Sequence, residues 1–221
     1  MIFHIIVKIA VLIAALAVSA SGGPIQTLGP GSAVTLPNRT VTFDNPPNSL
    51  VNYVEDGLVI STNGTLYNGF MPGLGFSGGF HYPSSGAAGA TSIRDAGNQL
   101  IFAIEFTAGS GFGDVFWSGT PMVLAWQTSR GGSETGWGVV TGLPYQTPFI
   151  VGIYDPQGFD LLRLVNPWSD FEFGPQFPLD AFNALAIDNV YAQMGPSAIP
   201  EPGTVLLAGA GLLALLALRR R

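Results

Sequence analysis

Residues 100–107 read Leu-Ile-Phe-Ala-Ile-Glu-Phe-Thr, and this stretch decides the fold. In an extended chain Phe102, Ile104 and Phe106 point to one face, and the residues between them, ending at Glu105, point to the other. This period of two with bulky apolar side chains is typical of a β-strand, whereas a helix would repeat its apolar positions every three or four residues. The stretch therefore predicts a strand.

Similar short apolar runs lie on both sides of this strand and are separated by clusters of turn residues. Glu55-Asp56-Gly57 has the composition of a tight turn and predicts a hairpin. Residues 69–89 are rich in Gly, Pro and Ser and predict a long loop or an irregular edge. Runs at intervals of about ten residues are typical of a sandwich or jelly roll. We therefore predict an all-β fold, a single antiparallel, jelly-roll-like β-sandwich over residues 32–194, with strands at residues 40–43, 50–54, 58–61, 100–107, 114–117, 122–128, 137–141, 149–154, 159–165 and 185–192.

The charge of the region between the two ends of the chain excludes several functions. From Ser21 to Ile199 there are four arginines, no lysine and 13 acidic residues, a formal charge of −9. Nucleic-acid binding depends on clustered Lys and Arg, so this composition argues against it. The chain has no cysteine, which excludes disulfides, thiolate metal sites and cysteine nucleophiles. His81 is the one histidine of this region, so a histidine-based metal cluster is excluded as well.

Both ends of the chain have the composition of export signals. Lys8 precedes the apolar residues 9–18, and Val18-Ser19-Ala20 supplies small residues for a signal peptidase, so residues 1–20 predict a signal peptide. The breakers in residues 21–31 predict a flexible lead-in. At the other end, a Pro-rich linker over residues 195–202 precedes an apolar segment.

The C-terminal segment combines a short apolar helix with a cationic end. Residues 203–218 predict a transmembrane helix of roughly 24 Å, shorter than the ~30 Å hydrocarbon core. Arg219, Arg220 and Arg221 follow it and can extend it by reaching the lipid headgroups on the cytoplasmic side. An interior helix of a soluble domain is the alternative, but no polar residue interrupts Val205–Leu218.

The order of these parts resembles a known sorting signal. Pro200-Glu201-Pro202, the apolar helix and the terminal arginines, paired with a signal peptide, look like the PEP-CTERM sorting signal, whose tail is also labelled after ice-binding proteins. The resemblance implies processing by a protease of the exosortase type in a Gram-negative bacterium. It also implies transient anchoring in the inner membrane and then delivery to the cell surface or extracellular matrix. It covers about a tenth of the chain and leaves the family of the body unidentified.

Acidic and amide side chains suggest a calcium site that joins the two ends of the body. Asp188 and Asn189 lie late in the sequence, and Asp44 or Glu55-Asp56 lie early, so they would meet if the first and last strands pair. Calcium prefers several oxygen ligands, but no consecutive calcium-binding loop is present. The alternative is that Asp188 and Asn189 bind backbone groups in a turn.

Aromatic side chains suggest contact with carbohydrate, because their rings pack on sugar C–H groups while amides and carboxylates bind hydroxyls. The candidate ligand-binding residues are Trp168, Asn166 and Trp117, of which we expect Trp168 to be the most exposed. Trp126 and Trp137 are further tryptophans of the body. For each tryptophan the alternative is burial in the core.

Three functions are compatible with these features. We predict a non-catalytic exported protein that binds extracellular polysaccharide. No cofactor is predicted with certainty, and Ca²⁺ is the one candidate. A secreted carbohydrate-active hydrolase is the first alternative, with Glu105 and a second acid such as Glu134 or Glu172 about 5–10 Å apart across a cleft. A structural component of the envelope or biofilm matrix is the second.

Overall fold

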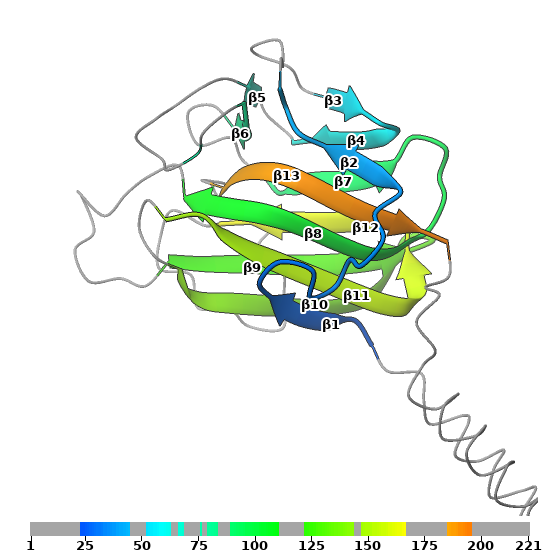
Figure 1. Ribbon diagram of the computed structural model, residues 1–221. Helices are drawn as coiled ribbons and strands as arrows, with labels where there is room; N and C mark the ends of the chain where they lie inside the picture. The colour runs from blue at the N-terminus through cyan, green and yellow to red at the C-terminus, as the bar shows by residue number, and fades with distance from the viewer. Residues whose placement is uncertain are drawn as a thin grey trace, which may run out of the picture.

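The computed structural model describes residues 23–44, 52–62, 66–68, 76, 79–83, 89–110, 122–143, 147–166 and 185–195. These residues form two antiparallel sheets and no helix, so the predicted all-β fold is confirmed (Figure 1). Within the same ranges no helix is long and apolar enough to cross a membrane. The predicted signal peptide, the Pro-Glu-Pro motif, the apolar segment 203–218 and the terminal arginines lie outside the described residues.

We call the larger sheet, with seven strands among the described residues, sheet A. Its strand order is β1, β11, β8, β13, β6, β5, and β2 also pairs with β13. Strand β13, the last described strand, therefore lies in the interior of the sheet and pairs with strands from the first half and the middle of the sequence (Figure 1). The bounds are β1 (Ile25–Leu28), β2 (Arg39–Val41), β5 (Leu66–Asn68), β6 (His81–Pro83), β8 (Ile101–Ser110), β11 (Phe149–Phe159) and β13 (Leu185–Met194).

The other sheet, sheet B, has six strands among the described residues in the order β10, β9, β12, β7, β4, β3. Strands β3 and β4 form the predicted hairpin, in which Glu55 pairs with Leu58. Asp56 and Gly57 between them both have positive φ, 44° and 78°, as a two-residue type I′ turn requires. The bounds are β3 (Asn52–Glu55), β4 (Leu58–Ser61), β7 (Thr91–Asp95), β9 (Met122–Arg130), β10 (Ser133–Leu143) and β12 (Leu161–Val165).

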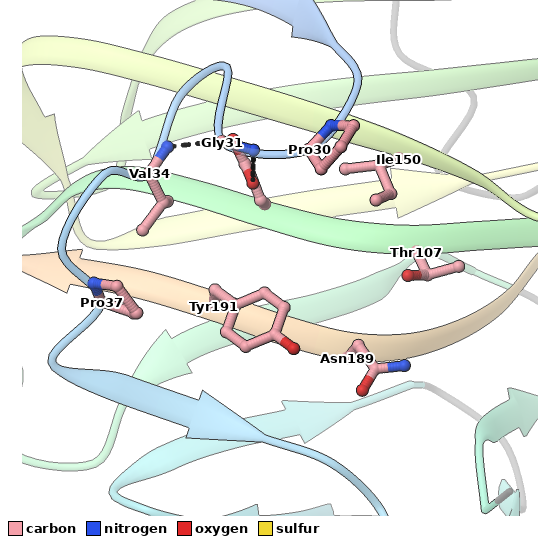
Figure 2. A pocket seen from close by; sticks show the side chains of 9 residues that line it. Pro30, Gly31, Val34, Pro37, Thr107, Ile150, Asn189 and Tyr191 are labelled. Atoms are coloured by element: carbon pink, nitrogen blue, oxygen red, sulfur yellow. Dashed lines mark hydrogen bonds between the residues drawn. The ribbon is translucent and has the colours of Figure 1, made fainter.

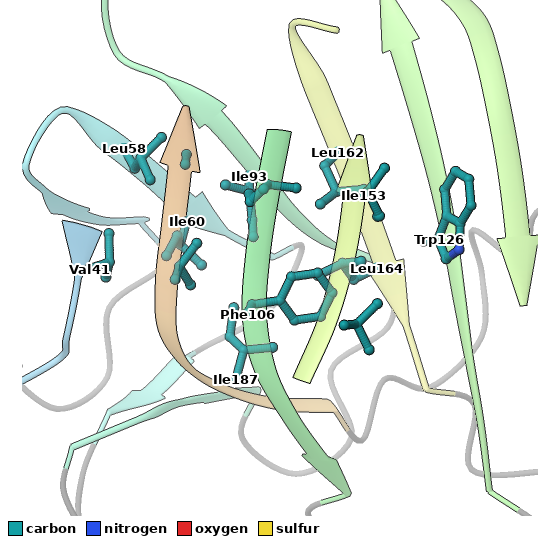
Figure 3. Close-up of a cluster of buried hydrophobic side chains, with 14 of the residues drawn as sticks. Val41, Leu58, Ile60, Ile93, Phe106, Trp126, Ile153, Leu162, Leu164 and Ile187 are labelled. Carbon is teal, nitrogen blue, oxygen red and sulfur yellow. The ribbon is translucent and has the colours of Figure 1, made fainter. Parts of the chain in front are cut away.

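The two sheets pack face to face around one main hydrophobic core (Figure 3). Sheet A contributes Phe106 and Ile153, and sheet B contributes Ile93, Leu162 and Trp126. All five side chains are at most 2% exposed. Burial of apolar surface at about 25 cal/mol per Å² is what holds the sheets together in a protein without disulfides.

Four described strands depart from the sequence-based expectation. Ile25–Leu28 lies in the predicted flexible lead-in but forms β1, because it can add to the free edge of β11. His81–Pro83 lies in the predicted loop at residues 69–89 but pairs with β13. The sequence predicts no strand at Leu66–Asn68, which forms β5 beside β6, or at Thr91–Asp95, which forms β7 between β12 and β4. In each case pairing with a distant strand outweighs a weak local pattern.

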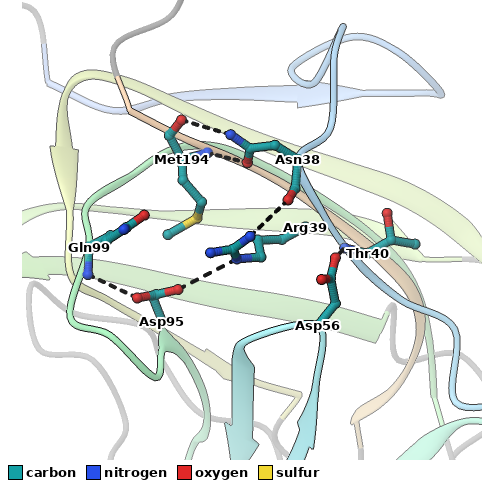
Figure 4. Close-up of polar contacts among 7 residues, drawn as sticks. All are labelled: Asn38, Arg39, Thr40, Asp56, Asp95, Gln99 and Met194. Carbon is teal, nitrogen blue, oxygen red and sulfur yellow. Dashed lines mark hydrogen bonds and ion pairs between the residues drawn. The ribbon is translucent and has the colours of Figure 1, made fainter.

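The start of the body holds the end of its last strand (Figure 4). The side-chain amide of Asn38 donates to the Met194 carbonyl at 3.0 Å and accepts from the Met194 N–H at 2.8 Å. Next to this pair, Arg39 Nε lies 3.8 Å from Asp95 Oδ1 and so connects sheet A with sheet B. These contacts fix the point at which the chain leaves the sandwich toward its C-terminal tail.

Candidate functional site

A row of side chains crosses the outer face of sheet B, the face directed away from the core. The strand registers place its six members directly beside one another, one on each strand. At about 4.8 Å between neighbouring strands, the row is about 24 Å long. We call it the sheet B row, and in order from β10 to β3 it consists of Trp137, Gln127, Arg163, Ser92, Ser61 and Asn52.

Alternation along the strands explains why these side chains point outward. On β9, Leu124 and Trp126 belong to the core, so Gln127 faces the other way. On β10, Gly138 lies directly under the Trp126 ring, and a Cβ at this position would be 2.5 Å from that ring. The glycine therefore lets the indole of Trp126 fill the interior, while Trp137, one residue earlier, projects to the outside.

Hydrogen bonds between members of the row fix its polar groups. Arg163 Nη1 donates to Gln127 Oε1 at 3.1 Å, and Gln127 Nε2 donates to Glu134 Oε2 at 2.6 Å. The hydroxyls of Ser61 and Ser92 lie 2.7 Å apart and share a hydrogen bond. The outer face of sheet B therefore presents polar groups whose side chains are already ordered, which lowers the entropy lost on binding a ligand.

Trp137 is the exposed aromatic group of this face. It is 47% exposed, whereas Trp126, on the opposite side of the same pair of strands, is 2% exposed. The face is not open along its whole width, since Ala125 and Val165 are buried at 2% and 0% exposure. A large apolar ring at the end of a polar row combines the two kinds of contact that a sugar chain offers.

The outer face of sheet A is organised differently, because residues 29–37 lie over it. Glu105 on β8 is 4% exposed. Its carboxylate accepts the backbone N–H groups of Gly31 at 3.0 Å, Ala33 at 2.6 Å and Val34 at 3.0 Å. Both oxygens are thus engaged with the covering segment. This geometry gives Glu105 a structural role and argues against the acid or nucleophile role considered for a hydrolase.

Close packing under the same segment requires a glycine on β11. Gly152 pairs with Glu105 on one side and Thr27 on the other. A Cβ at Gly152 would lie 2.3 Å from Thr27 Oγ1 and 2.7 Å from the Ala33 Cβ. Any larger residue would therefore lift residues 29–34 away from the sheet.

A cavity of about 210 Å³ remains between the covering segment and sheet A (Figure 2). Most of its wall is apolar, and Tyr191 and Asn189 on β13 form its floor. Its one carboxylate belongs to Glu105, which is held by the covering segment. The cavity therefore lacks the pair of facing acids that sugar hydrolysis needs. It is lined by Pro30, Gly31, Val34, Pro37, Glu105, Thr107, Ile150, Asn189 and Tyr191.

The residues of the calcium hypothesis meet at the edge of this face. Strand β2 pairs with β13, as the hypothesis required. Asp188 is 6% exposed, and burial raises its pKa to about 6, with the charges of Asp44 and Glu55 adding to the rise. Asp188 Oδ1 accepts from the Asn189 N–H at 2.7 Å, and Oδ2 accepts from the Asn189 amide at 2.8 Å.

These hydrogen bonds match the alternative reading, in which Asp188 and Asn189 bind groups within a turn. Asn189 has a positive φ of 47° at a register shift of β13, and the Asp44 carboxylate accepts from the Thr42 hydroxyl at 2.9 Å. Among the described residues no group of three or more His, Asp or Glu side chains is placed to hold a metal ion. Calcium binding therefore stays a prediction.

The predicted sugar-binding residues are only partly described. Asn166 is fully buried, and its amide donates to the Val123 carbonyl at 3.0 Å, so it offers no surface to a ligand. Trp117 and Trp168 lie outside the described residues. Sequence reasoning did not single out Trp137, because Gly136 and Gly138 on either side of it give no contrast between apolar and polar positions.

Comparison with known proteins identifies the tail. Residues 198–221 match the PEP-CTERM protein-sorting motif. The match confirms the resemblance of Pro200-Glu201-Pro202 and the residues that follow. A PEP-CTERM motif is a sorting signal for exosortase processing, so it implies export and transit through the membrane.

The body has similarities of fold to solved structures. One is a DUF4465 family protein from Bacteroides caccae, with a TM-score of 0.39 and 10% identity over 79% of this chain and 100% of that one. Another is the K1 cleaved adhesin domain of Lys-gingipain from Porphyromonas gingivalis, with a TM-score of 0.30 and 12% identity over 71% of this chain and 97% of that one. No curated protein matches the sequence.

Proposed function

We propose that this exported protein is a non-catalytic component of the cell surface or extracellular matrix that binds polysaccharide on the outer face of sheet B. The observation that carries the proposal is the exposed Trp137 at the end of the sheet B row. The face of an indole packs against sugar C–H groups, while Gln127, Ser92 and Asn52 donate to and accept from hydroxyls. An extended polymer matches the row better than a compact ligand, because the row runs across all six described strands of the sheet.

The non-catalytic part of the proposal is supported by the environment of Glu105, one of the acids considered for hydrolysis. Its two oxygens accept three backbone N–H groups. A carboxylate held in this way has no oxygen directed at a substrate bond, so we propose that Glu105 holds the covering segment in place. We further propose that the sandwich is jelly-roll-like, since β8, β11 and β13 of sheet A alternate along the chain with strands of sheet B.

The C-terminal tail determines how the protein is exported. We propose that residues 203–218 anchor the chain in the inner membrane during transit, with Arg219–Arg221 on the cytoplasmic side. The motif supports a protease of the exosortase type as the processing partner. Four residues separate Gly195, the last described residue, from Pro200, so processing would occur close to the end of β13.

Calcium binding by Asp44, Asp188 and Asn189 is a separate proposal. Thermal unfolding of the full chain, first stripped of metal and then given millimolar Ca²⁺, tests it. A rise in the melting temperature that Asp188→Asn removes would support the site, and an unchanged melting temperature would remove it.

The polysaccharide proposal is tested by binding of the full-length chain, kept in mild detergent because of its apolar tail, to a panel of neutral and acidic polysaccharides. Trp137→Ala should weaken binding by about tenfold or more, which corresponds to about 1.4 kcal/mol. Leu36→Ala is the matched control, because Leu36 is also exposed, at 72%, but belongs to the segment over sheet A. Equal affinities for Trp137→Ala and the wild type would overturn the proposal.

A further inference from the structure

The few positive charges of the body are unevenly distributed. The region from Ser21 to Ile199 has four arginines and no lysine, against 13 acidic residues. Arg39 pairs with Asp95, and Arg130 donates to the Gln157 carbonyl at 2.6 Å and to its side-chain oxygen at 2.8 Å, while Arg163 donates one N–H to Gln127 within the sheet B row. Arg94 and Arg163 both lie on the outer face of sheet B.

The positions of these two arginines follow from the strand registers. Arg163 on β12 is a member of the sheet B row and pairs with Ser92 on β7. Arg94 is two residues after Ser92, so it points to the same face about 7 Å further along the strand. Arg94 is exposed, and among the described residues neither arginine forms an ion pair.

Among the described residues, the two acids near these arginines are already held by hydrogen bonds. Glu134, the carboxylate beside the row, lies two strands away from Arg163 and accepts from Gln127. Asp160, directly before β12, accepts from the Gly131 N–H at 2.6 Å and so stabilises the turn between β9 and β10. The body carries 13 acids against four arginines, so the described place where two arginines share one outer face is where an anionic ligand is best accommodated.

We propose that the sheet B row binds a carboxylate-bearing, uronate-type polysaccharide, with Arg94 and Arg163 contacting its carboxylates and Trp137 stacking on a sugar ring. This inference rests on the proposed function and names its ligand class. A guanidinium presents paired N–H donors that match the two oxygens of a carboxylate. Trp137 is two strands from Arg163, about 10 Å across the sheet, so one extended chain reaches both. A nucleic acid does not fit, because two arginines supply too little charge for a phosphate backbone.

The test compares the affinity of the full-length chain in mild detergent for alginate, which bears uronates, and for dextran, which is neutral. Arg94→Gln and Arg163→Gln should each weaken binding to alginate by about fivefold or more and leave any binding to dextran unchanged. Arg130→Gln removes the same charge at a guanidinium already bound to Gln157, so it is the matched control and should change affinity less than about twofold. Arg94→Lys keeps the charge but loses the paired donors, so its affinity for alginate should lie between those of the wild type and Arg94→Gln. Raising the salt concentration should weaken binding to alginate.

The outcomes separate this inference from the proposed function. Binding to dextran as tight as to alginate would overturn the uronate ligand. The same conclusion would follow if Arg94→Gln and Arg163→Gln left the affinity for alginate unchanged while Trp137→Ala lowered it. In both cases the proposal that sheet B binds polysaccharide would stand. If Trp137→Ala also leaves binding unchanged, or if neither polymer nor any other in the panel binds, the proposed function fails as well. Circular dichroism of each variant shows whether a loss of binding comes from unfolding.

Discussion

The two outer faces of the sandwich differ although the two sheets share one core. On sheet A a row of paired residues, Thr27, Gly152, Glu105, Tyr191 and Thr40, runs across the strands. Its centre is a buried carboxylate that holds the covering segment. On sheet B the corresponding row contains Trp137, Gln127 and Arg163, with the aromatic ring exposed. One face is closed by hydrogen bonds to the covering segment, and the other keeps Trp137 exposed.

The difference shows how the environment of a polar side chain decides whether it stabilises the fold or stays at the surface. A carboxylate inside a protein is costly unless its oxygens are satisfied, and the three backbone donors around Glu105 satisfy them. Half-buried Gln127 and Arg163 hold each other in place at 3.1 Å but remain at the surface.

Glu105→Ala should open the covered face. It leaves the N–H groups of Gly31, Ala33 and Val34 without their acceptor, and at about 1–3 kcal/mol for each buried donor we expect a loss of about 4 kcal/mol in the free energy of unfolding. Urea denaturation measures it. Glu134→Ala, at an exposed acid beside the sheet B row, is the control and should cost less than about 0.5 kcal/mol. An equal loss of unfolding free energy in the two variants would contradict the difference between the two outer faces.

Gly152→Val should force the covering segment off sheet A. The added Cβ would overlap Thr27 Oγ1 and the Ala33 Cβ, so we expect about 3 kcal/mol of destabilisation. The same experiment should show faster proteolysis within residues 29–34. On the open face, Ser92→Val adds a larger side chain at a half-buried position and should cost less than about 1 kcal/mol. A Gly152→Val protein as stable as the wild type would mean that the segment is not packed as described.

Asp188→Asn should change how stability depends on pH. The pKa of Asp188 is raised from 3.8 to about 6, mainly by burial, so the folded state holds its proton more tightly than the unfolded state and the wild type loses stability as pH rises through this range. The variant should lack this loss and be about 2 kcal/mol more stable at neutral pH. His81, whose pKa burial lowers to about 3, has the opposite effect, since stability falls as pH falls below 6.5. Its contribution cancels when the two pH profiles are subtracted.

The difference profile gives the outcome for Asp188. A flat difference in stability between Asp188→Asn and the wild type from pH 3.8 to about 6 would show that the Asp188 carboxyl is not buried in sheet A.

Much of the fold, but little of the site, could be predicted from the sequence. Residues 100–107 correctly predicted a strand, β8 (Ile101–Ser110), but Ile101 rather than Phe102 joins Ile104 and Phe106 in the core. Asp56-Gly57 form the expected turn. Strand β1 was missed because its four residues form a strand only by pairing with β11, far along the sequence. The tail was predicted best, since its signal is a linear motif that needs no folded partner.

The candidate site depends on register, which the sequence does not display. Gln127, Arg163 and Ser92 are far apart in the chain, and they become neighbours only when β9, β12 and β7 pair in one alignment. A shift of one residue in any of these strands would turn its side chain into the core. Asn166 illustrates the reverse case, since a residue that was expected at the surface is buried against Val123.

Side-chain oxidation footprinting of the wild-type protein tests most directly whether sheet B carries the binding face. Hydroxyl radicals modify exposed side chains, and Trp137 at 47% exposure and Leu36 at 72% report on the two outer faces within one molecule. With saturating alginate, oxidation of Trp137 should fall severalfold while that of Leu36 stays unchanged. Protection of Leu36 instead, or equal oxidation of Trp137 with and without the polysaccharide at saturation, would contradict the account.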